Sequence, residues 1–195
     1  MTSAAPKSSL NDAMTPADVV GFWAEAGHRK WFAKDAAFDA EIQRRFEPLH
    51  LAASRGELMD WAETAEGALA LLLLLDQFPR NLYRGSAHAF ATDPLAKEIA
   101  VQALSRGFDQ AMEPELRPFF YLPYEHSERI EDQDRGLALC RAHYEATGDK
   151  GTLDWAILHR DIIVRFGRFP HRNRSLGRPT TPEEQAFLDQ GGFSG

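Results

Sequence analysis

The fold of this 195-residue chain depends on one segment, residues 66–78, which reads EGALALLLLLDQF. At 100° per residue its leucines point in every direction around a helix axis, and a helix that is apolar all round is buried on every side. We therefore expect this helix at the centre of the protein. Pro79 follows the segment directly, which predicts that the helix stops before it.

Start and stop signals on both sides of this segment predict further helices. Thr15-Pro16 and Thr181-Pro182-Glu183-Glu184 each place a capping threonine before a proline at the first helical position. No segment shows the period-2 pattern of a strand, and short connections favour antiparallel neighbours. The predicted fold is all-α, with about eight antiparallel-packed helices in a single domain over residues 15–195, after a flexible tail over residues 1–14.

Composition excludes several classes of function. The net charge is −7, which argues against general binding to nucleic acids or anionic membranes. The longest aliphatic run, Leu69 to Leu75, is far short of the ~20 residues that span a bilayer. One cysteine, Cys140, fits a reducing compartment, and no leader-like apolar segment is seen, so a cytoplasmic location is expected. We predict no metal and no cofactor, because Gly27 and Pro48 interrupt the two Glu-x-x-His pairs of the chain.

Asp76 is the informative residue of the central segment, because it is a carboxylate in the last turn of an apolar helix. It faces the negative end of the helix dipole, and burial of a carboxylate is costly without a partner. We therefore expect a cation or several donors beside it, with Arg80 and Arg84 as local candidates.

A second polar feature lies on the helix predicted from Thr152 to about Arg168. Asp161, Arg165 and Arg168 line up at i, i+4, i+7 between two apolar patches, which predicts a polar stripe in or beside the interior. The larger patch consists of Trp155, Leu158, Ile162, Phe166 and Phe169.

Charge and sequence pattern together predict where these features meet. Residues 155–180 hold six arginines and one aspartate, whereas residues 113–134 hold seven acids and two arginines. In addition, Gln77-Phe78-Pro79-Arg80-Asn81 is echoed by Arg168-Phe169-Pro170-His171-Arg172-Asn173. Either these segments only neutralise each other, or they form a cleft. The cleft would place Glu125 and His126 opposite a ligand-binding set of Asp76, Arg80, Asn81, Arg165, His171, Arg172 and Asn173.

Several longer blocks resemble one bacterial family of uncharacterised proteins, domain of unknown function 924. They include LLDQFPRN at residues 74–81, FYLPYEHSE at residues 120–128 and RFGRFPHRN at residues 165–173. The likeness runs from about Val19 to Gly192. It implies a compact helical fold related to the tetratricopeptide-like superfamily, but no established activity, cofactor or catalytic residue.

Three functions therefore remain open. The first is a helical binding module that holds a small anionic ligand or peptide in an Arg/His/Asn-lined cleft, since guanidinium and amide donors suit carboxylates and phosphates. Alternatively it is a metal-independent hydrolase or transferase in which His126 or His171 acts as base and Glu125 or Asp161 orients it. The third possibility is a purely structural polar cluster.

Overall fold

The computed structural model describes residues 14–194, and this part of the chain contains helices and no strand. The α-helices are α1 (Pro16–Ala26), α2 (His28–Trp31), α3 (Ala36–Ser54), α4 (Ala65–Leu72), α5 (Phe78–Leu82), α6 (Asp93–Ser105), α7 (Pro118–Glu125), α8 (Ile130–Thr147), α9 (Lys150–Phe166) and α10 (Pro182–Asp189). Eight of them have seven residues or more, which confirms the all-α class. The tetratricopeptide-like arrangement stays a prediction. The tail predicted for residues 1–14 lies, apart from Met14, outside the described residues.

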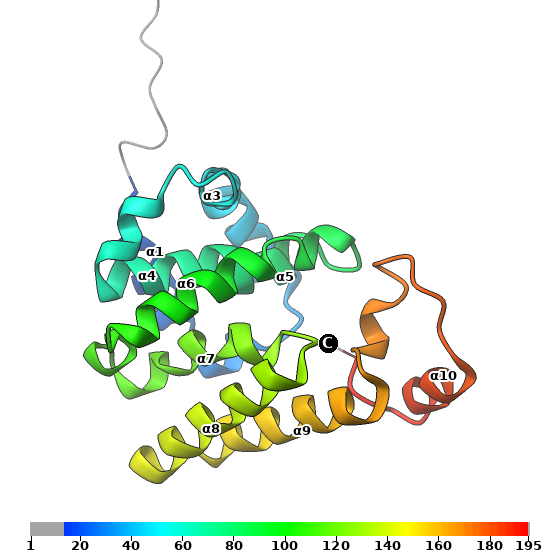
Figure 1. The fold of residues 1–195 in the computed structure, drawn as a ribbon. Helices are drawn as coiled ribbons and strands as arrows, with labels where there is room; N and C mark the ends of the chain where they lie inside the picture. The colour runs from blue at the N-terminus through cyan, green and yellow to red at the C-terminus, as the bar shows by residue number, and fades with distance from the viewer. Residues whose placement is uncertain (1–13, 195) are drawn as a thin grey trace, which may run out of the picture.

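Helix α4 and the turn that follows it form the centre of the molecule. Residues Leu69 to Leu75 have no exposed surface at all. Helices α1, α6 and α7 pack around α4, as Figure 1 shows. The apolar wheel of this segment therefore predicted its position correctly.

The central helix does not end before Pro79, contrary to the prediction. Residues Leu73–Gln77 form a π-helical turn, in which the backbone N–H of Phe78 donates to the carbonyl of Leu73, and α5 then continues through Pro79 to Leu82. A proline inside an α-helix lacks an N–H and clashes with the carbonyl four residues before it. The wider π turn accommodates Pro79, because it has already displaced that carbonyl from the usual hydrogen-bond pattern.

Side chains from other elements satisfy the carbonyls that the π turn releases. His50 Nδ1 of α3 donates to the Leu74 carbonyl at 2.8 Å, and the Thr92 hydroxyl donates to the Leu75 carbonyl at 2.5 Å. The Arg80 guanidinium donates to the Asp76 carbonyl. Buried carbonyls need such partners, so the π turn is fixed in place by three separate segments.

Helices α8 and α9 form an antiparallel pair along one edge of the molecule, with α7 beside them (Figure 1). Gly136 lets α8 approach the end of α7, because a Cβ there would lie 3.1 Å from the Cβ of Tyr124. Helix α9 ends at Gly167, whose φ of +69° is in the left-handed region. The chain then forms a short 3-10 turn, Pro170–Arg172, before α10. These connections bring residues 168–173 next to the ends of α5 and α7.

The edge position of α9 makes the predicted polar stripe wrong for Asp161 and Arg165. Ile162 and Phe169 are buried as expected. Trp155, however, is 50% exposed and Val164 is 58% exposed. Asp161 is exposed, and exposed Arg165 pairs with Glu183 of α10 at 3.1 Å. The second apolar patch, Ile157 and Val164, is 40% and 58% exposed. Asp161 and Arg165 therefore lie at the surface, whereas Arg168 is half-buried and binds Glu184 of α10.

No helix within residues 14–194 has both the length and the apolar character needed to cross a membrane.

Candidate functional site

The π turn places the carboxylate of Asp76 inside the protein, with 1% of the residue exposed. His126 Nδ1 lies 2.7 Å and 2.9 Å from its two oxygens, and Gln77 Nε2 donates to it at 2.5 Å. Arg80 Nη1 lies 3.4 Å from the carboxylate. Burial raises the pKa of Asp76, but the charge of Arg80 and the contact with His126 outweigh it and hold the pKa below its ordinary value. Asp76 is therefore an anion with a cation beside it, as the sequence predicted.

His126 is the residue that Asp76 orients. It follows the last residue of α7, and 12% of its side chain is exposed. A carboxylate only accepts hydrogen bonds, so Nδ1 carries the proton and Nε2 keeps its lone pair. Burial and the nearby charge of Arg80 lower the pKa of His126 to about 4, which makes the ring neutral at pH 7. Within the described residues no group hydrogen-bonds Nε2, so this atom is available to a ligand.

Arg80 and Arg172 meet at one carboxylate, Asp93, in the first turn of α6. Arg80 binds it through both terminal nitrogens at 3.1 Å, and Arg172 Nη1 lies 3.3 Å from Oδ2. The two arginines belong to the two echoing segments of the sequence. The structure therefore brings these two segments together at Asp93.

The guanidinium of Arg172 is clamped between two aromatic rings. Its central carbon lies 4.6 Å from the ring centre of Phe90 and 4.7 Å from that of Phe169. Nη1 points to Asp93, whereas Nε is buried and has no hydrogen-bond partner in the part of the chain described. Burial and the charge of Arg80 lower the pKa of Arg172 to about 10, so it remains a cation at neutral pH. The edge of Arg172 formed by Nε and Nη2 is consequently an unpaired, rigidly held pair of donors.

Two further histidines and a phenylalanine lie beside this clamp. His159 packs against Phe169 at 5.6 Å and against Phe193 at 4.8 Å, while His171 packs against the same two rings at 5.6 Å and 5.0 Å between centroids. Burial lowers the pKa of His159 to about 4 and, together with the charge of Arg172, that of His171 to about 3. His171 Nδ1 is buried and has no partner among residues 14–194. This side of the site is neutral and aromatic around one cation.

These contacts close into a ring, which we call the polar ring. It runs through His126, Asp76, Arg80, Asp93, Arg172, Phe169 and His159, and the rings of His159 and His126 lie 6.1 Å apart. Its members come from the π turn, α5, α6, the residue after α7, α9 and the segment after α9. Two atoms of this ring have no hydrogen-bond partner among the described residues: Nε2 of His126 and Nε of Arg172.

Glu125 lies behind the polar ring rather than on a facing wall, so its predicted role in orienting the histidine is wrong. It is 1% exposed, accepts a hydrogen bond from the Cys140 thiol at 3.2 Å and lies 3.6 Å from His159 Nδ1. Burial, with the charge of Asp76 nearby, raises the pKa of Glu125 to about 7. Residues 125 and 126 are adjacent near the end of a helix and point to different sides, and Asp76 is the carboxylate that contacts His126.

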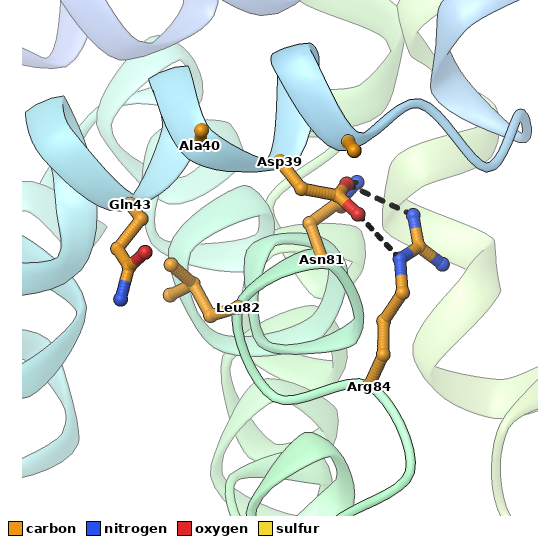
Figure 2. A pocket seen from close by; sticks show the side chains of 7 residues that line it. Asp39, Ala40, Gln43, Asn81, Leu82 and Arg84 are labelled. Carbon is orange, nitrogen blue, oxygen red and sulfur yellow. Dashed lines mark hydrogen bonds and ion pairs between the residues drawn. The ribbon is translucent and has the colours of Figure 1, made fainter.

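Asn81 is outside the polar ring. Its amide donates to Asp39 at 2.8 Å, and Arg84 binds the same carboxylate through two nitrogens at 2.6 Å and 3.0 Å. These residues line a shallow cavity of about 340 Å³ between α3 and α5, shown in Figure 2. Successive residues of α5 point in different directions, so Arg80 reaches Asp93 while Asn81 reaches Asp39. At this cavity Asn81 and Arg84 are therefore both paired with Asp39.

Asn173, Arg165 and Asp161 are also outside. Asn173 is fully buried and bonds Glu184 at 3.2 Å and Arg178 at 2.9 Å, which attaches the segment after α9 to α10. Arg165 and Asp161 lie on the exposed face of α9. Of the predicted ligand-binding set, the structure brings together Asp76, Arg80, Arg172 and His171, and it adds His126 from the predicted catalytic set.

The sequence did not single out Asp93, Phe90 and Phe169 as site residues. Asp93 lies in Thr92-Asp93-Pro94, a helix-start pattern in which an acidic residue has a local explanation. Phe169 belongs to the larger apolar patch of the sequence and is buried as predicted, with 0% exposure, and Phe90 has no local signal beyond its apolar character. Their second role, stacking on Arg172, depends on a contact between distant segments that no local pattern reports.

The fold and the site define the class of this protein: it is all-helical, with a polar ring built on a π turn. The chain belongs to the family described as bacterial protein of unknown function (DUF924), which matches residues 19–192. It is similar in structure to the protein of unknown function ATU0120 from Agrobacterium tumefaciens, with 53% sequence identity and a TM-score of 0.86 over 90% of this chain and 97% of that chain. A comparison with curated proteins finds no match.

Proposed function

We propose that this protein binds a small oxyanion, a carboxylate or a phosphate, on the free edge of Arg172. The observation that carries the proposal is the buried guanidinium edge, clamped between Phe90 and Phe169 and unpaired among the described residues. The Nε–Nη2 edge of arginine matches two oxygens of a carboxylate or phosphate. Within this chain, Arg84 already binds both oxygens of Asp39 in that manner.

The energetics support a ligand at this edge. A buried donor without a partner costs about 1–3 kcal/mol, which a ligand bound to it would recover. Here two buried donor-capable atoms of adjacent residues, Arg172 Nε and His171 Nδ1, lack partners among residues 14–194. An oxyanion would satisfy Arg172 and would also offset a positive charge for which Asp93 is shared with Arg80.

The surroundings favour a small ligand over an extended peptide. The polar ring closes on itself, and Phe193 covers the two histidines on one side. Helical binding modules that hold peptides present a long open surface instead.

We also place the protein in the cytoplasm, because its one cysteine is a buried thiol bonded to Glu125.

Calorimetric titration and thermal shift with inorganic phosphate test the proposal, with citrate as a parallel carboxylate arm. A ligand of the folded state raises the melting temperature. We expect one of the two anions to bind, and Arg172→Lys to weaken binding by roughly tenfold or more, because lysine keeps the charge but loses the two-donor edge.

Arg174→Ala is the matched control, because Arg174 is an exposed arginine two residues away. It should leave the affinity unchanged. Absence of any saturable binding of either anion, or equal affinities for wild type and Arg172→Lys, would show that the edge of Arg172 is not a ligand site.

A further inference from the structure

We propose that His126 Nε2 is a nucleophile that accepts a phosphoryl group from a small phosphorylated donor held at Arg172. This inference rests on the proposed oxyanion site and commits it to phosphate. It assigns a transferase chemistry to the polar ring, with His126 as the catalytic residue and Asp76 as its positioning residue.

The first support is the orientation of the imidazole. Asp76 is within 2.7 Å and 2.9 Å of Nδ1, which fixes the ring and keeps the proton on that nitrogen. The lone pair of Nε2 then points away from the carboxylate. A nucleophile whose ring is oriented by a third group in this way needs no further rotation before attack.

The second support comes from the thiol and hydroxyl groups nearby, because each is already occupied. The Cys140 thiol donates to Glu125, the Ser127 hydroxyl donates to Asp132 at 2.7 Å, and the Thr92 hydroxyl donates to the Leu75 carbonyl. None of these contacts involves His126. Nε2 of His126, by contrast, has no partner among residues 14–194. His171 Nδ1 lacks one too, but within the described residues no carboxylate bonds that ring as Asp76 bonds His126.

The third support is electrostatic. Phosphoryl transfer is catalysed mainly by positioning and by cations around the transferred group. The free edge of Arg172 supplies donors for two phosphoryl oxygens, and Arg80 adds a second positive charge on the same ring. Once Nε2 carries the phosphoryl group, the imidazole ring is positively charged, and the Asp76 carboxylate at Nδ1 stabilises that charge.

The step can be written for phosphoramidate, a simple donor. The Nε2 lone pair forms the N–P bond while the P–N bond of the donor breaks, and its electron pair leaves with nitrogen that is already protonated, as ammonia. The proton on Nδ1 of His126 stays there. Attack of water on the phosphorus then releases inorganic phosphate, and Nε2 regains its lone pair.

Incubation of the full chain with phosphoramidate tests this, followed by phosphorus NMR, intact mass and peptide mapping under alkaline conditions that preserve phosphohistidine. His28 and His88 are exposed and provide internal references for unassisted reactivity. We expect His126 to be labelled at Nε2 at least roughly tenfold faster than either, since activation of a nucleophile and positioning of its partner each raise the rate.

Variants separate the roles. His126→Asn removes Nε2, while its side-chain amide can still donate to Asp76, so the protein should fold and lose the label. Arg172→Lys should slow labelling roughly tenfold or more, and Arg174→Ala should leave it unchanged. Added inorganic phosphate should protect His126 by competing for the same edge.

Labelling of His126 no faster than that of His28 and His88, in protein that still binds phosphate, would overturn the nucleophile and leave the oxyanion site standing. Failure of phosphate to bind, together with no label on His126, would overturn both. Fast labelling that persists in Arg172→Lys would contradict the role of the clamp in holding the donor.

Discussion

The two echoing segments of the chain, Phe78–Asn81 and Phe169–Asn173, use the same parts in the same order. In each, a fully buried phenylalanine precedes a proline at the first or second position of a helical segment, and the arginine that follows binds Asp93 and stacks near Phe90. In each, the asparagine turns away and bonds a carboxylate that is also bound by an arginine. One local design therefore occurs twice around one aspartate.

The difference between them lies in how far the arginine is satisfied. Arg80 contacts Asp76 and binds both oxygens of Asp93, so its donors are largely used. Within residues 14–194 the Arg172 guanidinium has one hydrogen bond, to Asp93, and its segment carries one extra residue, His171. The comparison teaches that a repeated motif can serve the fold at one copy and remain open at the other.

The largest expected effect comes from removing the carboxylate that satisfies Arg80. Asp76→Ala should lower the free energy of unfolding by about 3–5 kcal/mol, because it leaves a buried cation and a buried histidine without their partner. Urea denaturation measures this. A variant with wild-type stability would mean that Arg80 does not need Asp76 as a partner. Arg80 and Arg172 would then not differ in how far their hydrogen-bonding groups are satisfied.

Replacing each arginine in turn tests the comparison directly. Arg80→Ala should cost about 2–3 kcal/mol, reduced from the full value for a buried pair because 22% of its side chain is exposed. Arg172→Ala should cost only about 1 kcal/mol, because the loss of two ring contacts is offset by removal of an unpaired donor. Equal losses of stability in paired thermal and urea melts would contradict an open second copy.

The extra residue, His171, should make stability depend on pH. Its pKa in the folded protein is about 3, below the ordinary 6.5, so the unfolded chain binds more protons below pH 6.5. This contribution to stability is complete above pH 6.5 and is lost as the pH falls towards 3. His171→Asn should flatten the slope by up to about 1.4 kcal/mol per pH unit. His88→Asn, at an exposed site, should not; a similar slope in both variants would contradict the burial of His171.

The smallest effect is expected where the sequence and the structure disagree. Arg165 pairs with Glu183 at the surface, with side-chain exposures of 52% and 65%, and it is outside the polar ring. Arg165→Ala should change the free energy of unfolding by less than about 0.5 kcal/mol and leave phosphate affinity as in wild type. Loss of phosphate binding in this variant would restore the polar stripe on α9 to the site.

Much of the fold could be predicted because the signals are local. Thr15 and Thr181 both form the capping boxes that their sequences indicate. The position of the leucines in residues 69–75 could be predicted, since a helix with no polar face can lie only in the interior. Asp76 could be predicted as a paired carboxylate for the same reason, because burial without a partner is too costly.

The rest of the site depends on information that is not local. Pro79 ends a helix in most settings, and the π turn forms here because His50, Thr92 and Arg80 satisfy the released carbonyls. The direction of Asn81 depends on that turn. The exposure of Asp161 depends on α9 lying at an edge, which its own apolar pattern contradicts. Each miss reflects tertiary packing that overrode a correct local pattern.

The π turn also makes the length of the central helix as important as its composition. A π turn contains one residue more than the α-helical turn it replaces, so Leu73–Gln77 can be regarded as a single-residue insertion held in the middle of the protein. Deleting one of its leucines would keep the segment fully apolar and restore regular α-helix. It would also rotate everything after it by about 100°, so that Arg80 would turn away from Asp93. This core should accept exchanges among aliphatic residues far more readily than a change of one in their number.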